Sequence, residues 1–77
     1  MVSRVYIGMG SNLGDGIGNL LGAWERLGEE EGVTPRTLSS PYMTAPVDMT
    51  SQHWFTNAVG FLETTRTPLE MLQLLLA

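Results

Sequence analysis

The sequence predicts an α+β fold in which a small sheet and two helices form a two-layer sandwich. Residues 2–8 alternate apolar and polar side chains, and residues 54–62 are rich in aromatic and apolar side chains, which is typical of strands. Between them, apolar side chains recur at helical spacing from residue 17 to residue 27. A helix-start pattern at residue 67 adds a second helix. With 77 residues, the chain is long enough for one small domain.

The first predicted strand leads into the first predicted helix through a turn at residues 11–16, which is rich in glycine and polar side chains. Asp15 stands where a helix cap is expected. The apolar stripe of this helix consists of Ile17, Leu20, Leu21, Trp24 and Leu27. Gly28 is predicted to end the helix in a left-handed conformation.

The middle of the chain predicts connections and one weak strand. Residues 29–32 form an acidic turn, which we interpret as a solvated connection. Residues 33–40 are a weak strand candidate because Pro35 interrupts them. Residues 41–53 are mostly polar and contain two prolines, which predicts a long irregular loop. Loops of this length inside a small domain are often functional.

The last two elements are a strand at residues 54–62 and a helix that begins near residue 67. Thr67 can cap this helix, Pro68 suits its first position, and Glu70 completes a capping box. The resulting order, strand-helix-strand-strand-helix, is that of a ferredoxin-like sandwich that lacks its last strand. Because the final helix carries no stop signal, we expect its pattern to continue in a longer protein.

Composition excludes several classes of protein. Eight acidic residues against four basic ones give a net charge of −4, and all four basic residues are arginines. This argues against a nucleic-acid partner and against P-loop or lysine-based chemistry. There is no cysteine, so disulfides and Cys/His zinc sites are excluded. No apolar run approaches the roughly 18 residues of a membrane span, and the start does not resemble a secretory signal, so we expect a cytoplasmic protein with no membrane partner.

Three glycines near the start invite a dinucleotide-binding interpretation. Gly8, Gly10 and Gly14 follow a predicted strand and precede a helix. Their spacing is off by one, and no acidic residue ends a second strand about 20 residues on. We therefore interpret them as a tight strand-to-helix turn that only glycine can make.

Other candidates for chemistry are sparse. His53 is the only histidine, and we interpret it as a partly exposed neighbour of Trp54 rather than a general base. Asp48 has no acidic partner close in sequence, so no metal site is predicted. Met43 and Met49 could line an adaptable pocket.

Asn57 stands out because it is a polar residue in the middle of the most apolar strand, on the same face as Phe55 and Val59. If its amide is buried, it must be hydrogen-bonded. It could bond structurally to the neighbouring loop backbone. Alternatively, it could read the amide edge of a flat heterocycle that stacks on Phe55.

Five segments in this order resemble a known family, the 6-hydroxymethyl-7,8-dihydropterin pyrophosphokinases of folate biosynthesis. The segments are residues 6–14 (YIGMGSNLG), 39–47 (SSPYMTAPV), 52–59 (QHWFTNAV), 62–64 (LET) and 67–72 (TPLEML). They cover essentially the whole chain. The Gly-Ser-Asn-Leu motif alone is weak, whereas its combination with Tyr-x-Thr-x-Pro and Phe-x-Asn-Ala is specific.

The resemblance implies an enzyme that transfers pyrophosphate from ATP to the hydroxymethyl group of a pterin, with Mg²⁺. By position, Phe55 is similar to the aromatic residue that stacks on the pterin, and Asn57 to the residue that reads its edge. The stretch from Ala45 to Trp54 is similar to one of the mobile loops that close over the substrates. The turn that lines the pterin would consist of Thr44, Ala45, Pro46 and Val47.

Members of this family are considerably longer, and their second half carries the nucleotide-binding arginines and the metal-binding carboxylates. We therefore expect residues 1–77 to form one ferredoxin-like domain, the N-terminal and pterin-binding half of such an enzyme. No catalytic or metal-binding residue is assigned in this half. The chain alone is expected to bind neither ATP nor Mg²⁺ and to be inactive.

Two alternatives remain open. One is a non-catalytic pterin-binding or oligomerising module, and the other is an unrelated ferredoxin-like interaction domain. Without a last strand, the Val2–Gly8 strand would have a bare edge, and such edges tend to find partners. We expect a homo-oligomer that forms through this edge or through the Leu69–Leu76 helix face.

Overall fold

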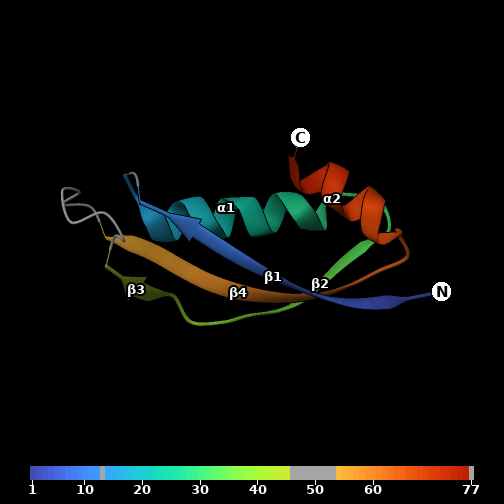
Figure 1. The fold of residues 1–77 in the computed structure, drawn as a ribbon, viewed down its shortest axis with the longest axis horizontal. Coiled ribbons are helices and arrows are strands. Elements are labelled where there is room, and N and C mark those ends of the chain that lie inside the picture. The colour runs from blue at the N-terminus through green and yellow to red at the C-terminus, as the bar shows by residue number, and fades with distance from the viewer. Residues whose placement is uncertain (13, 46–53, 77) are drawn as a thin grey trace.

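The computed structural model describes residues 1–12, 14–45 and 54–76, which form a four-stranded antiparallel sheet and two helices (Figure 1). Both helices lie on the same face of the sheet. The predicted α+β class is therefore confirmed. In chain order the elements are β1 (Ser3–Ser11), α1 (Gly16–Gly28), β2 (Val33–Leu38), β3 (Tyr42–Thr44), β4 (Phe55–Thr64) and α2 (Pro68–Leu76).

Strand β4 is the centre of the sheet. On one side it pairs with β1 along its length, from Ser3 opposite Thr64 to Ser11 opposite Thr56. On its other side the beginning of β4 pairs with β3 and its second half pairs with β2. Among the described strands β1 has β4 as its one neighbour, so β1 lies at the edge of the sheet as predicted.

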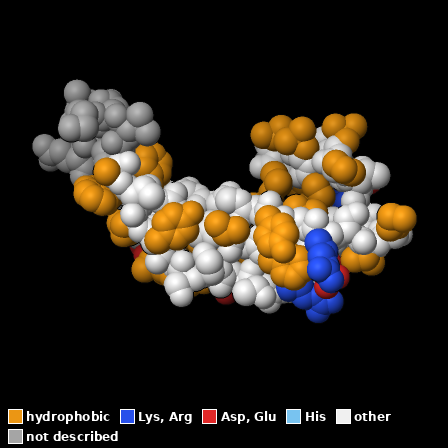
Figure 2. Space-filling view, turned by 60° about the horizontal axis from the view of Figure 1, so that its bottom comes forward, with side chains coloured by type: hydrophobic (Ala, Val, Ile, Leu, Met, Phe, Trp, Pro, Cys, Tyr) orange, Lys and Arg blue, Asp and Glu red, His pale blue; other side chains and the backbone are white. Residues whose placement is uncertain are grey.

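The two faces of β4 differ in burial because side chains alternate along a strand. The even-numbered residues from Thr56 to Thr64 are all buried and face the helices. The odd-numbered residues are half-buried or exposed and lie on what we call the open face. Figure 2 shows hydrophobic side chains along this open face. The core between sheet and helices is small and centres on Ile7, Val33, Leu62 and Met71.

The glycines before α1 do not all have the role in the turn that the sequence predicts. Gly8 and Gly10 do not make the turn; they lie inside β1, opposite Val59 and Asn57. The turn glycine is Gly14, which has a φ of 58° in the left-handed region. Pairing with β4 therefore extends β1 to Ser11, beyond the predicted end at residue 8.

Helix α1 begins as predicted but ends differently. The Asp15 side chain accepts a hydrogen bond from the Gly18 amide at 3.0 Å, so the predicted cap is confirmed. The predicted left-handed end at Gly28 is wrong, because Gly28 is the last residue of the helix and does not have a positive φ. Gly32, with a φ of 80°, has the left-handed conformation and directly precedes β2.

The middle segments correct two further expectations. Tyr42–Thr44, placed in the predicted irregular loop, forms strand β3 against β4. Strand β2 exists but ends at Leu38, and its register shifts between Pro35 and Thr37. A bulge on an outer strand tolerates a proline there because no ladder bond is needed from its nitrogen.

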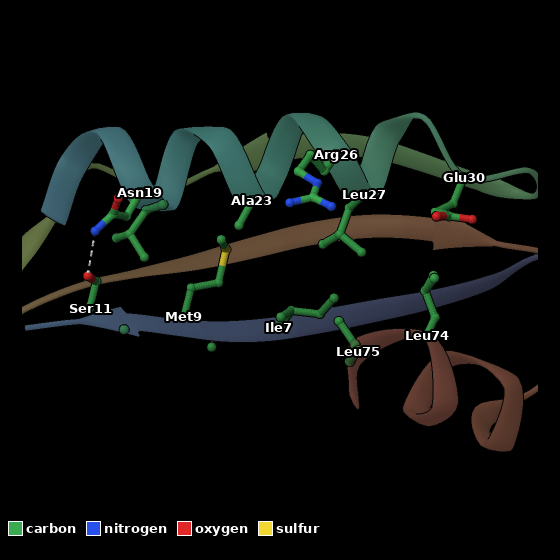
Figure 3. A pocket seen from close by; sticks show the side chains of 13 residues that line it. Ile7, Met9, Ser11, Asn19, Ala23, Arg26, Leu27, Glu30, Leu74 and Leu75 are labelled. Atoms are coloured by element: carbon green, nitrogen blue, oxygen red, sulfur yellow. Dashed lines mark hydrogen bonds between the residues drawn. The ribbon is translucent and has the colours of Figure 1, made fainter. Parts of the chain in front are cut away.

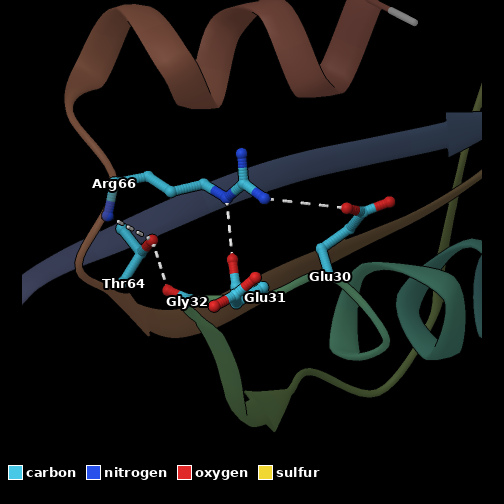
Figure 4. Close-up of polar contacts among 5 residues, drawn as sticks. All are labelled: Glu30, Glu31, Gly32, Thr64 and Arg66. Atoms are coloured by element: carbon cyan, nitrogen blue, oxygen red, sulfur yellow. Dashed lines mark hydrogen bonds and ion pairs between the residues drawn. The ribbon is translucent and has the colours of Figure 1, made fainter.

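Arg66 fastens the connection before α2 to the turn after α1 (Figure 4). Its Nε donates to the Glu31 carbonyl at 2.9 Å, and its guanidinium lies 3.7 Å from a Glu30 carboxylate oxygen. Beside it, the Thr64 hydroxyl donates to the Gly32 carbonyl at 2.7 Å. The acidic turn is therefore exposed at its side chains and anchored through its backbone.

The capping box of α2 is confirmed. The Thr67 amide donates to the Glu70 carboxylate at 2.9 Å, and the Glu70 amide donates to the Thr67 hydroxyl at 3.2 Å. In the described part of the chain no helix is long and apolar enough to cross a membrane.

The capping box makes stability depend on pH in acid. The hydrogen bonds from the Thr67 amide and hydroxyl hold the pKa of Glu70 below its ordinary value of 4.5. A carboxyl group with a lowered folded-state pKa stabilises the fold above the unfolded value, and this contribution is lost as pH falls through the folded value. We expect Glu70→Gln to flatten the decline in the free energy of unfolding below about pH 4.5, measured by urea titration at several pH values. An unchanged pH profile in the variant would contradict this assignment.

Candidate functional site

Four residues from three strands meet at one end of the open face. Phe55 and Asn57 are neighbours on the same face of β4, with Thr44 opposite Phe55 on β3. On the other side, Gly10 of β1 lies opposite Asn57. The antiparallel register thus brings together residues that are far apart in sequence.

The Asn57 amide fastens β3 to β4. Its Nδ2 donates to the Thr44 hydroxyl oxygen at 2.8 Å, to the Phe55 carbonyl at 3.3 Å and, more weakly, to the Tyr42 carbonyl at 3.5 Å. The structural bond to the neighbouring segment, one of the two roles predicted for Asn57, is therefore present. The amide is half-buried rather than part of the core, because its face of β4 is the open one.

The other end of the amide faces β1. A methyl group added at Gly10 would lie 3.2 Å from Asn57 Oδ1 and 4.0 Å from Phe55 Cδ1. Gly10 therefore leaves space above the backbone between the amide oxygen and the aromatic ring. No hydrogen bond from a described residue to Oδ1 is found, so this oxygen is available as an acceptor.

The start of α1 holds this end of β4 in place from the opposite face. Thr56, between Phe55 and Asn57, is buried and donates to the Met43 sulfur at 3.3 Å. Gly16 approaches Thr56 so closely that a side-chain carbon on Gly16 would lie 2.8 Å from Thr56 Cβ. The site thus rests on a closely packed helix–strand contact.

The arrangement suits a flat, neutral and polar heterocycle. Phe55 offers an aromatic face, Asn57 Oδ1 accepts a hydrogen bond, and the Thr44 hydroxyl can donate one. None of these side chains carries a charge, so the site offers neither an acid–base pair nor a nucleophile with an adjacent base. These groups can hold a ligand by stacking and hydrogen bonds.

Four of the six predicted site residues lie in the described part of the chain. Thr44, Phe55 and Asn57 come together, and Ala45 follows β3 directly and is exposed. Pro46 and Val47 lie outside the described residues. So do Asp48, Met49, His53 and most of the Ala45–Trp54 loop, whose predicted mobility stays a prediction.

Sequence reasoning missed Gly10 as a member of this site. A glycine in a strand often marks the close approach of another group, and Gly10 alternates in step with Tyr6 and Gly8 on one face of β1. The alternation of Gly10 with Tyr6 and Gly8 is the one signal in the sequence that points to this face of β1. It identifies Gly10 as a site residue only when the register of β1 with β4 is known.

The described residues do not fit a magnesium site. They contain no group of three or more His, Cys, Asp or Glu side chains that could hold a metal ion. Two arginines are engaged elsewhere, Arg36 with Glu63 and Arg66 with Glu30.

Comparison with known proteins places these observations in a family. A family model described as 7,8-dihydro-6-hydroxymethylpterin-pyrophosphokinase (HPPK) matches residues 6–77. Two curated relatives, from Methylorubrum extorquens and Pseudomonas aeruginosa, are each 38% identical, match 99% and 100% of this chain, and are named 2-amino-4-hydroxy-6-hydroxymethyldihydropteridine pyrophosphokinase. The chain spans about half (48%) of the length of each relative. Because the family match extends over nearly the whole chain, this protein belongs to the HPPK family.

Proposed function

We propose that this chain forms the pterin-binding part of a 6-hydroxymethyl-7,8-dihydropterin pyrophosphokinase. The observation that carries the proposal is the Asn57 amide, whose Nδ2 is held by β3 while its Oδ1 faces the space above Gly10. Family membership and the names of the two relatives support the choice of a pterin as the ligand.

A pterin would use the two ends of this site differently. Its planar ring would stack on Phe55, while a ring N–H or amino group would donate to Asn57 Oδ1. The hydroxyl of Thr44 can donate to a ring acceptor, because its oxygen already accepts from Asn57. We assign the remaining contacts to Ala45, Pro46 and Val47, which follow Thr44 in the chain.

The transfer of pyrophosphate from ATP, with Mg²⁺, is proposed for the whole enzyme and not for these residues alone. Phosphoryl transfer depends on positioning and on stabilisation of charge by metal ions and cationic groups. The described residues supply a neutral recognition site and no cluster of metal ligands. We therefore propose that the 77 residues bind a pterin without catalysing its pyrophosphorylation.

We also propose that the fold is ferredoxin-like. The strand order β1-β4-β2, with both helices on one face, supports this arrangement. The cytoplasmic location stays a prediction.

Calorimetry tests the proposed function directly. We expect the chain to bind 6-hydroxymethyl-7,8-dihydropterin alike with and without a non-hydrolysable ATP analogue and Mg²⁺, because the recognition site does not involve the nucleotide. With ATP and Mg²⁺ we expect no product. Absence of pterin binding under all conditions would refute the binding role. Turnover by the isolated chain would refute the proposal that these residues bind a pterin without catalysing its pyrophosphorylation.

A further inference from the structure

The sulfur of Met43 is held on the helix side of the sheet, on the opposite face from the candidate site. Met43 lies opposite Thr56 in the pairing of β3 with β4, and its Sδ accepts a hydrogen bond from the Thr56 hydroxyl at 3.3 Å. Its neighbour Thr44 faces the other way and accepts from Asn57 on the open face. Met43 is therefore connected to the site through its strand and not through its side chain.

Strand β3 has only three residues and is fastened to β4 from both faces of the sheet. On the open face the Asn57 amide donates to the Thr44 hydroxyl, and on the helix side the Thr56 hydroxyl donates to Met43. In the described part of the chain β4 is the one strand beside β3. A change at Met43 is therefore passed on to Thr44, because β3 has no second strand to hold it in place.

Met43 is accessible from solution, unlike the methionine of the core. It is 57% exposed, whereas Met71 is 4% exposed. Met9 is half-buried and points into the groove between β1 and α1 (Figure 3). Met1 is exposed as well, but it precedes β1, which begins at the far end of β4 from the site. In the proposed ferredoxin-like order a last strand beside β1 would lie on the other side of β4 from Met43.

A peroxide oxidises a thioether without any other reactant. The sulfur attacks one oxygen of hydrogen peroxide, so that an S–O bond forms, the O–O bond breaks and hydroxide leaves. The hydroxide takes the proton of the transferred oxygen and becomes water. The sulfur has then lost two electrons, which the peroxide has gained. The product is methionine sulfoxide, which methionine sulfoxide reductases return to methionine.

Oxidation of Met43 changes the partner of a buried hydroxyl group. Thr56 is 7% exposed, and its side-chain hydrogen bond with a described residue goes to Met43. In the sulfoxide the acceptor is the added oxygen, which must take the place of the sulfur if the bond is to persist, so the sulfur must withdraw. Thr56 cannot follow it, because Gly16 at the start of α1 packs against its Cβ. Either this bond is lost or β3 moves, and both outcomes weaken the hold on Thr44.

We propose that Met43 is a peroxide-sensitive modification site that regulates ligand binding at the candidate site. With the thioether, Thr56 and Asn57 hold β3 from both faces, and Thr44 is kept in position for the ligand. With the sulfoxide, β3 is loosened and the affinity falls. The inference rests on the proposed pterin-binding function, whereas the state of β3 can be measured without a ligand.

Peroxide treatment of the parent chain and of Met43→Leu tests this site. Leucine is similar in volume and has no sulfur, so the variant keeps the other four methionines, Met1, Met9, Met49 and Met71, for comparison. We expect peptide mass spectrometry to show oxidation of Met43 well before that of Met71. After removal of the peroxide, calorimetry with 6-hydroxymethyl-7,8-dihydropterin should show an affinity about 3- to 10-fold weaker in the treated parent, the equivalent of one neutral hydrogen bond. Treatment should leave the affinity of Met43→Leu unchanged.

Reduction and amide hydrogen exchange complete the test. Methionine sulfoxide reductases of both stereospecificities should restore the affinity of the treated parent. Without ligand, the amides of residues 42–44 should exchange faster after treatment of the parent and at the same rate after treatment of Met43→Leu. If the untreated chain binds no pterin, the proposed function fails, while faster exchange in β3 still supports the effect of Met43 on that strand.

Several results would overturn the inference. Oxidation of Met71 before Met43 would show that the exposed sulfur is not the reactive one. Oxidised Met43 with unchanged affinity or unchanged exchange in β3 would show that its sulfur does not hold the strand. An equal loss of affinity in Met43→Leu would assign the effect to another methionine, and a loss that the reductases do not reverse would show damage instead of regulation.

Discussion

Replacing Gly60 with alanine is expected to remove a large part of the stability of this protein. Gly60 is buried on the helix face of β4, and the Trp24 ring of α1 packs directly on it. An added Cβ would overlap this ring, lying 2.7 Å from Trp24 Cη2 and 3.0 Å from Cε3. The ring is rigid, so the helix must move away or the side chain must leave its position.

The expected loss follows from the size of the domain. Overpacking of a filled core costs about 1–3 kcal/mol. A domain of 77 residues has a total stability of only about 4–12 kcal/mol. We therefore expect Gly60→Ala to lower the free energy of unfolding by about 2 kcal/mol, measured by urea titration with circular dichroism.

Gly8→Ala is the matched control. Gly8 also lies in a paired strand, opposite Val59, but an added Cβ there has nothing within 4 Å. We expect this variant to stay within about 0.5 kcal/mol of the parent. A Trp24→Leu change should also cost less in the Gly60→Ala background than in the parent, because the overlap is relieved. Equal unfolding midpoints for the two glycine variants would show that Trp24 does not pack on Gly60.

The contact between Trp24 and Gly60 shows which parts of the fold could be predicted from the sequence. The stripe around Trp24 and the strand around Gly60 follow from local periodicity, so α1 and β4 could be predicted. That the ring of Trp24 lies on Gly60 depends on how the helix crosses the sheet, which periodicity does not determine. A glycine inside a strand ordinarily weakens it, whereas Gly60 is a packing requirement.

The glycines at residues 8, 10, 28 and 32 also show that local sequence patterns do not determine tertiary contacts. Glycine is compatible with a turn, a helix end and a strand, so its role depends on its partner. Gly8 and Gly10 face β4, and Gly32 rather than Gly28 takes the left-handed conformation, where its neighbours are Thr65 and Arg66. The roles of Gly8, Gly10 and Gly32 therefore depend on contacts with residues that are distant in the sequence.

The candidate site was predicted in part for a different reason. Asn57 and Phe55 stand out in the residue pattern of their strand, whereas Thr44 was added by resemblance to a family, and the register of β3 with β4 brings the three together. Which face of β4 is open could not be predicted, because both faces carry apolar side chains such as Val59 and Leu62. The packing of both helices on one side decides it.

Asn57→Ala is expected to weaken pterin binding by about 10- to 100-fold, which corresponds to the loss of one or two hydrogen bonds in a partly desolvated site. The variant also removes the bonds that hold β3, so a weaker affinity by itself would not separate recognition from support. Asn57→Asp separates them, because it keeps an acceptor oxygen while losing the Nδ2 donor. Both variants lose the bonds from Nδ2 and should loosen β3, Asn57→Ala more than Asn57→Asp, because a carboxylate can still accept from the Thr44 hydroxyl.

If Oδ1 accepts a hydrogen bond from the pterin, Asn57→Asp must bind more tightly than Asn57→Ala, since a carboxylate still accepts from a ring N–H or amino group. If Asn57 only supports β3, affinity follows the free energy of unfolding in each variant, because the one difference between them is then how much of the bond to Thr44 remains. Thr37→Ala, on β2 opposite Phe61 and away from the site, should leave affinity unchanged. Titrating the three variants with the pterin, alongside urea unfolding of each, distinguishes the two roles, since equal affinities of the alanine and aspartate variants would remove Asn57 from the recognition site.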